Sequence, residues 1–320
     1  MVTSEKQPRI RLSDVHPELR RPYWFMRTVP VGRPWFLELA GRAMPLTPDP
    51  KPQAGIRFEK VGFGLASGAR VYTPAGGGSG GAVLWIHGGG MVLGAASQDD
   101  RRCFELAREL DVVVVSAEYR LAPQHPFPAA LDDCRAAWQW LQEHAPNRWI
   151  DPARVAVGGQ SAGGGLAASL VQRLHDEGGV QPVAQWLFCP MLDDRTAANR
   201  DLDAVRHILW NNAANRVGWR AYLGVQPGAL TVPEHAVPGR RADVSGLPPT
   251  WIGTGDIELF HDENVRYADA LCDAGVDCVL DVVAGAPHAF ESLVPTADVS
   301  RAYRTRSVEW LRAHLSRESS

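Results

Sequence analysis

The chain has 320 residues, of which 45% are hydrophobic and 22% are charged, a composition typical of globular proteins that excludes disordered, collagen-like and transmembrane classes. The formal net charge of -3 at pH 7 provides neither the basic field of a nucleic-acid-binding protein nor a polybasic membrane anchor. The N-terminus lacks the apolar core of a secretory signal. The cysteines are odd in number without a C-x-x-C pair, so we expect buried thiols in a cytoplasmic protein, with no disulfide framework or metal site (Cys103, Cys134, Cys189, Cys272 and Cys278).

Prolines interrupt the first 50 residues at short intervals, which predicts short helices and no long regular element. This segment also carries aromatic residues that need a packing surface, and we assign residues 1–50 to the N-terminal part of a cap. Apolar and polar residues alternate over 56–63, and a second short run follows at 69–74. Such alternation predicts two antiparallel edge strands, each with one face in water.

A glycine-rich segment at 76–81 formally fits the dinucleotide-binding pattern G-x-G-x-x-G. That pattern binds a pyrophosphate where it follows a strand and opens a helix. Here the glycines lead into the apolar run 82–86, which predicts another strand. We therefore predict a flexible hairpin loop at 76–81 and no cofactor site.

Beyond residue 82, predicted strands and helices alternate along the chain. Continuous apolar or β-branched runs predict strands at 82–86, 111–115, 154–158, 183–188, 250–253 and 278–283. Apolar residues at helical spacing predict helices at 97–110, with Ser97 as the N-terminal cap, and at 130–141, 166–174 and 303–315. This alternation predicts an α/β fold in which helices cover both faces of a mostly parallel sheet.

Residues 194–245 contain no clean strand pattern, yet they are too apolar for a linker, with Leu202, Ile208, Trp210, Trp219 and Leu223 among them. We predict that they join the N-terminal segment in a helical cap over one end of the sheet. The expected division assigns 1–50 and 195–245 to the cap, and 51–194 and 246–320 to the core.

The first motif that can carry chemistry is Gly159 to Gly163, which fits G-x-S-x-G between a predicted strand and a predicted helix. A serine on a sharp strand-to-helix turn exposes its hydroxyl, and the flanking glycines keep side chains away from the strained backbone. The helix N-terminus adds a positive dipole and a free N–H beneath the serine. Ser161 is therefore a candidate nucleophile, the alternative being a serine that caps the helix.

The second motif, His87-Gly88-Gly89-Gly90, follows the predicted strand at 82–86. Consecutive glycines let successive N–H groups point into one concavity, as a tetrahedral oxyanion requires, and one such donor is worth about 3 kcal/mol of transition-state stabilisation. The alternative is an ordinary flexible loop. Because ligands bind at the carboxyl ends of parallel strands, the two motifs together favour a catalytic site there.

A serine nucleophile needs a base that is oriented by an acid. In the order serine, acid, histidine, the acid would follow the strand at 250–253 and the histidine the strand at 278–283. His288 occupies the second position, in a short loop. The acid remains open among four carboxylates that follow the earlier strand: Asp256, Glu258, Asp262 and Glu263.

Seven ordered segments between Ala82 and Phe290 resemble the hormone-sensitive-lipase-like branch of the α/β-hydrolases, the bacterial esterases marked by HGGG and GDSAGG. They begin at His87, Tyr119, Phe127, Asp151, Gly159, Pro190 and Gly285. The resemblance implies an α/β-hydrolase fold with a helical cap, acting without a cofactor or metal. Two departures stand out: Gln160 replaces the family's aspartate before the serine, and a glutamate occupies the position of the triad acid.

The resemblance also implies roles for individual residues. The family acid lies three residues after a glycine and four before an Asp-Glu pair, which indicates Glu258 rather than Asp256. The implied oxyanion donors are the backbone N–H groups of Gly88, Gly89 and Ala162. Tyr119-Arg120 and Asp193-Asp194 are implied to support the loops of the active site.

We therefore predict a serine carboxylesterase in which Ser161 attacks the ester carbonyl, His288 takes its proton and Glu258 orients the imidazole. The resemblance implies short acyl chains, and it implies a homodimer through the edge strand and last helix. Two roles stay open for five aromatic residues, lining the acyl pocket or packing the cap onto the core: Trp24, Phe25, Trp35, Trp210 and Trp219. Alternatives are an amidase, deacetylase or lactonase with the same triad, and a small-molecule receptor of the gibberellin-receptor type, which lacks the histidine.

Overall fold

The computed structural model describes residues 10–25, 48–64, 67–205 and 207–316. The strands are β1 (Ile56–Gly64), β2 (Ser67–Pro74), β3 (Ala82–Ile86), β4 (Val113–Glu118), β5 (Val155–Gln160), β6 (Ala184–Phe188), β7 (Thr250–Gly255) and β8 (Cys278–Val283). The longer helices are α3 (Asp100–Leu110), α4 (Ala129–His144), α5 (Ala162–Glu177), α7 (Asn212–Leu223), α8 (His261–Asp273) and α10 (Asp298–Leu315). Short helices are α1 (Arg20–Phe25), α6 (Asp194–Ala198) and α9 (Phe290–Leu293), with 3-10 turns η1 (Pro17–Leu19), η3 (Ala96–Asp99), η4 (Ala145–Arg148), η5 (Arg200–Asp203) and η6 (Pro238–Arg240).

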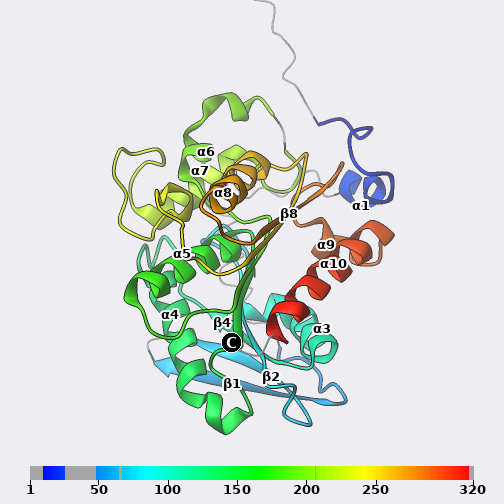
Figure 1. Ribbon diagram of the computed structural model, residues 1–320. Helices are drawn as coiled ribbons and strands as arrows, with labels where there is room; N and C mark the ends of the chain where they lie inside the picture. Colours follow the sequence, from blue (N-terminus) through cyan, green and yellow to red (C-terminus); the bar gives the residue numbers. More distant parts are fainter. Residues whose placement is uncertain (1–9, 26–47, 65–66, 206, 317–320) are drawn as a thin grey trace, which may run out of the picture.

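The eight strands form one sheet in the order β1-β2-β4-β3-β5-β6-β7-β8 (Figure 1). Every pairing from β4 across to β8 is parallel, and the two pairings at the other edge are antiparallel. This confirms the mostly parallel sheet that the alternation of strands and helices predicts.

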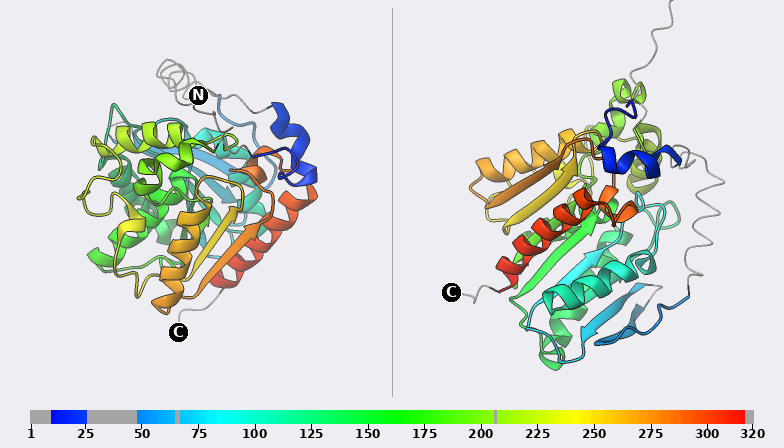
Figure 2. Two further views of the ribbon diagram at one scale, coloured as in Figure 1. Left: turned by 90° about the horizontal axis from the view of Figure 1, so that it is seen from above. Right: turned by 90° about the vertical axis from the view of Figure 1, so that its right-hand side faces the viewer.

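Helices cover both faces of the sheet, with α4, α5 and α8 on one face and α3 and α10 on the other (Figures 1 and 2). Because side chains alternate along a strand, β3 contributes to two cores: Leu84 and Ile86 pack with the first set of helices, and Val83 and Trp85 with the second. Full burial of one such apolar side chain contributes about 1.5–3 kcal/mol. The loops that follow the strands are therefore attached to a sheet whose two faces are both tightly packed.

The two predicted edge strands pair antiparallel as expected, but their environments differ. Strand β1 lies at the edge of the sheet and has one exposed face. Strand β2 is buried along almost its whole length because helix α3 covers one of its faces and α4 the other, so the prediction of a wet face is wrong there. The hairpin predicted at 76–81 is also wrong, since β4 separates β2 from β3.

Helix α3 carries the predicted apolar stripe, and Cys103, Leu106, Ala107 and Leu110 are buried. The predicted cap at Ser97 is wrong, because Ser97 lies within η3 and α3 begins at Asp100. The thiols are also only partly as expected. Three cysteines are buried, whereas Cys272 is exposed and Cys278 is half-buried at the β8 edge.

Helices α6 and α7, with η5 and η6, occupy the region predicted as the second part of the cap, above the carboxyl ends of the strands (Figure 1). Within 194–205 and 207–245 there is no strand. At the N-terminus the structure describes η1 and α1. The rest of that predicted cap segment, 1–9 and 26–47, lies outside the described residues, so the division into cap and core stays a prediction. Among the described residues no helix combines the length and the apolar character that crossing a membrane would require.

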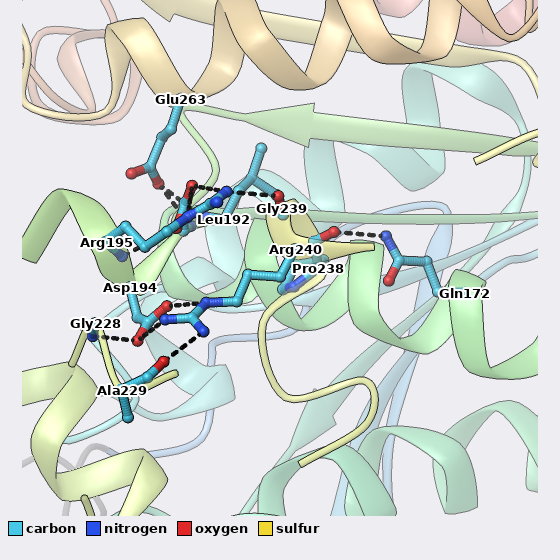
Figure 3. A network of polar contacts seen from close by, with 11 residues as sticks. Gln172, Leu192, Asp194, Arg195, Gly228, Ala229, Pro238, Gly239, Arg240 and Glu263 are labelled. Atoms are coloured by element: carbon cyan, nitrogen blue, oxygen red, sulfur yellow. Dashed lines mark hydrogen bonds and ion pairs between the residues drawn. The ribbon is translucent and has the colours of Figure 1, made fainter. Parts of the chain in front are cut away.

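An ion pair and a buried carboxylate bind the segment that follows β6 to neighbouring parts of the protein (Figure 3). The Asp194 carboxylate accepts hydrogen bonds from Arg240 Nε at 2.7 Å and Nη2 at 2.9 Å. Glu263 Oε1, from α8, accepts hydrogen bonds from the backbone N–H groups of Leu192 at 2.6 Å and Asp193 at 3.2 Å. Asp193 and Asp194 thus contact the protein's own framework, in agreement with the supporting role implied for them.

Candidate active site

Ser161 alone forms the turn between β5, which ends at Gln160, and α5, which begins at Ala162. Its backbone has φ 58° and ψ -121°, a strained left-handed conformation for a residue with a side chain. A Cβ atom at Gly159 would overlap the Gly163 carbonyl, and one at Gly163 would overlap the Ile86 carbonyl. The two glycines of G-x-S-x-G are therefore required for the turn to pack against the end of β3.

The structure brings the three predicted side chains into one hydrogen-bonded chain. His288, in the loop between β8 and α9, has Nε2 2.9 Å from Ser161 Oγ and Nδ1 2.9 Å from Glu258 Oε2. All three residues are buried, with exposed fractions of 7% for Ser161 and 4% for each of the others. The imidazole can thus accept the serine proton through Nε2 while Nδ1–H donates to the carboxylate.

The Glu258 carboxylate, in the loop between β7 and α8, is held in place by hydrogen bonds from β7 and from the loop itself. Thr254 Oγ1 donates a hydrogen bond to Oε1 at 2.7 Å, and the Phe260 N–H donates to Oε2 at 3.0 Å. With the imidazole, these donors make three hydrogen bonds to a carboxylate whose side chain is fully buried. Such bonding fixes the oxygen that faces His288.

The other three candidate acids have different contacts. Asp256 is exposed, and its Oδ1 accepts a hydrogen bond from the Gly285 N–H at 2.6 Å. Asp262 is exposed on the first turn of α8. Glu263 faces the loop after β6, and burial raises its pKa well above the usual range. Of the four carboxylates left open by the sequence, Glu258 is the one that contacts the imidazole.

The glycine loop after β3 lies directly against the nucleophile turn. A Cβ atom at Gly88 would sit 3.3 Å from Ser161 Cβ, and Gly89 has φ 132°, a conformation that favours glycine. In the described part of the chain, no backbone hydrogen bond uses the N–H of Gly88, Gly89 or Ala162. Gly88 and Ala162 therefore lie next to Ser161, and Gly89 follows Gly88 in the same loop.

His87 supports this loop from beneath. Its buried ring stacks on Tyr119, with ring centroids 4.2 Å apart, and Tyr119 Oη donates a hydrogen bond to the His87 carbonyl at 2.9 Å. Burial lowers the pKa of His87 to about 4, so this imidazole is neutral at pH 7. Next to it, Arg120 makes a bidentate ion pair with Asp133 at 2.8 and 2.9 Å. Tyr119 and Arg120 thus have the supporting contacts implied for them.

Helix α7 and the segment before it contact the glycine loop from above. The Trp210 ring occupies the space beside the Gly90 backbone, and Gly218 lies so close that a Cβ atom would be 2.7 Å from the Gly90 carbonyl oxygen. Of the five aromatic residues predicted to line a pocket, Trp210 touches this loop and Trp219 is fully buried within the core. The other three lie outside the described side chains.

The sequence did not indicate every residue that holds the site. Thr254 donates a hydrogen bond to the acid, and Tyr23 Oη donates one to the His288 carbonyl at 3.1 Å. Gln160, the last residue of β5, donates one to Glu291 in α9. Tyr23 and Gln160 are 265 and 131 residues from their partners, so no local spacing links them. Thr254 lies four residues before Glu258, a separation at which a loop side chain can reach back.

A family model described as the alpha/beta hydrolase fold matches residues 83–292. Among curated proteins, the chain is 36% identical to carboxylic ester hydrolase LipN of Mycobacterium tuberculosis over 259 residues, which is 78% of this chain and 67% of LipN. It is 38% identical to esterase LipI of the same organism over 195 residues, or 61% of this chain and 60% of LipI. The matched regions therefore span about two thirds of these relatives.

Solved structures resemble the chain over almost its whole length. A bacterial heroin esterase superposes with a TM-score of 0.85 at 35% identity, covering 96% of this chain and 99% of that one. Esterase LipW from Mycobacterium marinum superposes with a TM-score of 0.83 at 31% identity, covering 98% and 99%. The predicted resemblance to bacterial esterases and the α/β-hydrolase fold are thus confirmed.

Proposed function

This chain belongs to the α/β-hydrolase fold family, and from that membership and the geometry of its site we infer that it is a serine carboxylesterase. The observation that carries the inference is the buried chain of hydrogen bonds from Glu258 through His288 to Ser161, beside a glycine loop in which the Gly88 and Gly89 N–H groups bind no backbone carbonyl of the described residues. The similarity to proteins named as esterases and carboxylic ester hydrolases points to the same activity.

In the acylation step, Ser161 Oγ attacks the ester carbonyl while its proton passes to His288 Nε2. Glu258 keeps Nδ1–H oriented and stabilises the imidazolium that forms. The carbonyl oxygen becomes an oxyanion, and the N–H groups of Gly88, Gly89 and Ala162 stabilise its charge. The imidazolium then donates its proton to the departing alcohol, leaving an acyl group on Ser161.

Deacylation repeats these steps with water as the nucleophile. His288 Nε2 accepts a proton from the water, which attacks the acyl carbonyl, and the same N–H groups hold the second oxyanion. The proton returns to Ser161 Oγ as the acid leaves. Neither step needs a metal or an organic cofactor, so the residues described account for the whole reaction.

We propose that the substrates are small esters with short acyl chains, because Trp210 and α7 pack directly on the glycine loop. With p-nitrophenyl esters of increasing chain length, kcat/KM should be highest at acetate to butyrate. It should fall about tenfold or more for longer chains, since each methylene forced into a closed pocket costs about 1–3 kcal/mol. Trp210→Ala should shift the optimum to longer chains. A wild-type optimum at octanoate or beyond would contradict the proposal.

The same triad could serve an amidase, a deacetylase or a lactonase. We favour simple esters because of the named relatives, and comparing kcat/KM for matched esters, anilides and lactones tests the choice. A receptor without turnover is disfavoured, because His288 is present and lies 2.9 Å from the serine hydroxyl.

We further propose that two copies pair through β8 and α10. The edge strand β8 exposes Val279 and Val282 at 38% and 41%, and an unpaired strand edge with apolar side chains is a template for pairing. Light scattering should give twice the mass of one chain, and a single-chain mass would rule this out. A cytoplasmic location is proposed on the five free cysteines, and cell fractionation tests it.

A further inference from the structure

We propose that Gln160, Glu291 and Ser292 form a clamp that fixes the distance between the nucleophile and the base, with Gln160 and Glu291 as positioning residues. Gln160 Nε2 donates hydrogen bonds to Glu291 Oε1 at 2.5 Å and to Ser292 Oγ at 2.7 Å. The clamp rests on the proposed function, because it concerns the approach of Ser161 and His288.

The clamp joins the nucleophile turn to the segment that carries the base. Gln160 immediately precedes Ser161, whereas Glu291 and Ser292 follow His288 by three and four residues. Along β5, Ala156 packs in the core under α3 and α10, and Gln160, four residues on, shares that face of the sheet. The bonds of Gln160 therefore lie on the side of the turn away from the helix α5 core, separate from the bond between Ser161 and His288.

The base loop, residues 284–289 between β8 and α9, has attachments on both sides of His288. Before His288, the Gly285 N–H donates to Asp256 and the Gly285 carbonyl accepts from the His16 N–H, while Tyr23 Oη donates to the His288 carbonyl. After His288, the buried Phe290 ring packs against Tyr303. The Gln160 clamp adds the hydrogen bonds that join the C-terminal side of this loop directly to the residue before Ser161. A displacement of about 1 Å between reacting groups can lower a rate about a hundredfold.

The pairing of an amide with a carboxylate suits this buried position. Burial raises the pKa of Glu291, and the Gln160 hydrogen bond, His288 and Arg102 act in the opposite direction. The titratable groups that interact with Glu291 are Tyr23, Asp99, Arg102, Cys189, His288 and Tyr303. An amide at 160 donates to Glu291 without adding a second negative charge, whereas the family's aspartate would bring two carboxylates together.

Gln160→Ala and Glu291→Ala test the clamp directly. Each should lower kcat for p-nitrophenyl acetate about 10- to 100-fold with little change in KM, because the substrate still binds while the serine and imidazole are less well aligned. The matched control is Gln172→Ala in α5. Gln172 is also a buried amide with two hydrogen bonds, to the Pro238 carbonyl at 3.0 Å (Figure 3) and to Tyr267 Oη at 3.2 Å, and its loss should leave kcat unchanged.

A variant that places a second carboxylate in the clamp distinguishes a positioning role of Gln160 from a general effect on stability. In Gln160→Glu, two carboxylates raise each other's pKa, so they share a proton at low pH and keep the clamp. As pH rises the proton is lost, both groups become charged, and activity should fall at alkaline pH where the wild type is still active. Adding Glu291→Gln restores one amide and one carboxylate, so the double variant should recover kcat and lose the alkaline decline.

Labelling of wild-type Ser161 by a phosphonate ester, read by mass spectrometry, keeps the two proposals distinguishable. A wild type that is neither labelled nor active would overturn the esterase proposal. A labelled and active wild type, with Gln160→Ala and Glu291→Ala both at wild-type kcat, would overturn the clamp alone. Thermal unfolding of each variant completes the test: equal losses of kcat and folded protein, with an unchanged pH profile in Gln160→Glu, would assign these residues a merely structural role.

Discussion

Ser161→Ala should lower kcat for p-nitrophenyl acetate by about 10⁴- to 10⁶-fold, because it removes the oxygen that forms the acyl-enzyme. The oxyanion donors are backbone groups and stay in place, so a small residual rate above that of water is expected. The variant should bind ester substrates and give no burst of p-nitrophenol. Pre-steady-state absorbance at 400 nm or an equivalent wavelength measures both the burst and the steady rate.

The control for this variant is Ser169→Ala, a buried serine two turns further along α5. It removes a hydroxyl of the same kind from within the helix that follows Ser161, at a position with no hydrogen bond to His288, so its kcat should match that of the wild type. If Ser161→Ala hydrolysed the ester as fast as the wild type, the assignment of the nucleophile would be wrong. The hydrolysis would then have to come from another group or from a contaminant.

Glu258→Gln should lower kcat by about 10³- to 10⁴-fold, because an amide no longer stabilises the imidazolium and can turn its NH₂ group toward Nδ1. The fold should be retained, since glutamine has the same shape and its one amide oxygen can still accept the hydrogen bond from Thr254 Oγ1, while the Phe260 N–H loses its acceptor. Measuring kcat and the thermal unfolding midpoint of Glu258→Gln and of the wild type distinguishes a loss of catalysis from a loss of folded protein.

Asp256→Asn is the matched comparison for this change. Asp256 is exposed, and the asparagine oxygen can still accept the Gly285 N–H, so we expect a loss of less than about tenfold. A large loss in Asp256→Asn, together with an active Glu258→Gln, would transfer the role of the acid to Asp256. Equal and small losses in both variants would argue against any carboxylate partner for His288.

The sequence predicts well those parts of the site that depend on local backbone geometry. The turn at Ser161 requires small residues on both sides because the end of β3 lies against it. This requirement is visible in the sequence as the five-residue motif at 159–163. His288 could be placed because the order of the strands dictates which loop reaches the nucleophile. The sheet itself follows from runs of apolar residues whose burial on both faces leaves few alternatives.

The predictions that fail concern contacts between residues that are far apart in the sequence. Ser97 does not start α3, because the neighbouring Asp99 bonds Trp85 Nε1 at 2.7 Å and the chain makes a 3-10 turn first. Strand β2 has no wet face because α3 and α4, both later in the chain, pack on its two faces. The bond between Gln160 and Glu291 joins positions 131 residues apart, and neither residue belongs to a pattern that would indicate the other.

The close packing of Gly218 and Trp210 on Gly90 means that the cap and the oxyanion loop share one surface. If the proposed acyl pocket were widened by shifting α7, the neighbouring N–H groups that we propose as oxyanion donors would move as well. We therefore expect changes of acyl selectivity made through α7 to alter kcat too. Engineering for bulky esters should accordingly begin with side chains that leave the path of α7 unchanged.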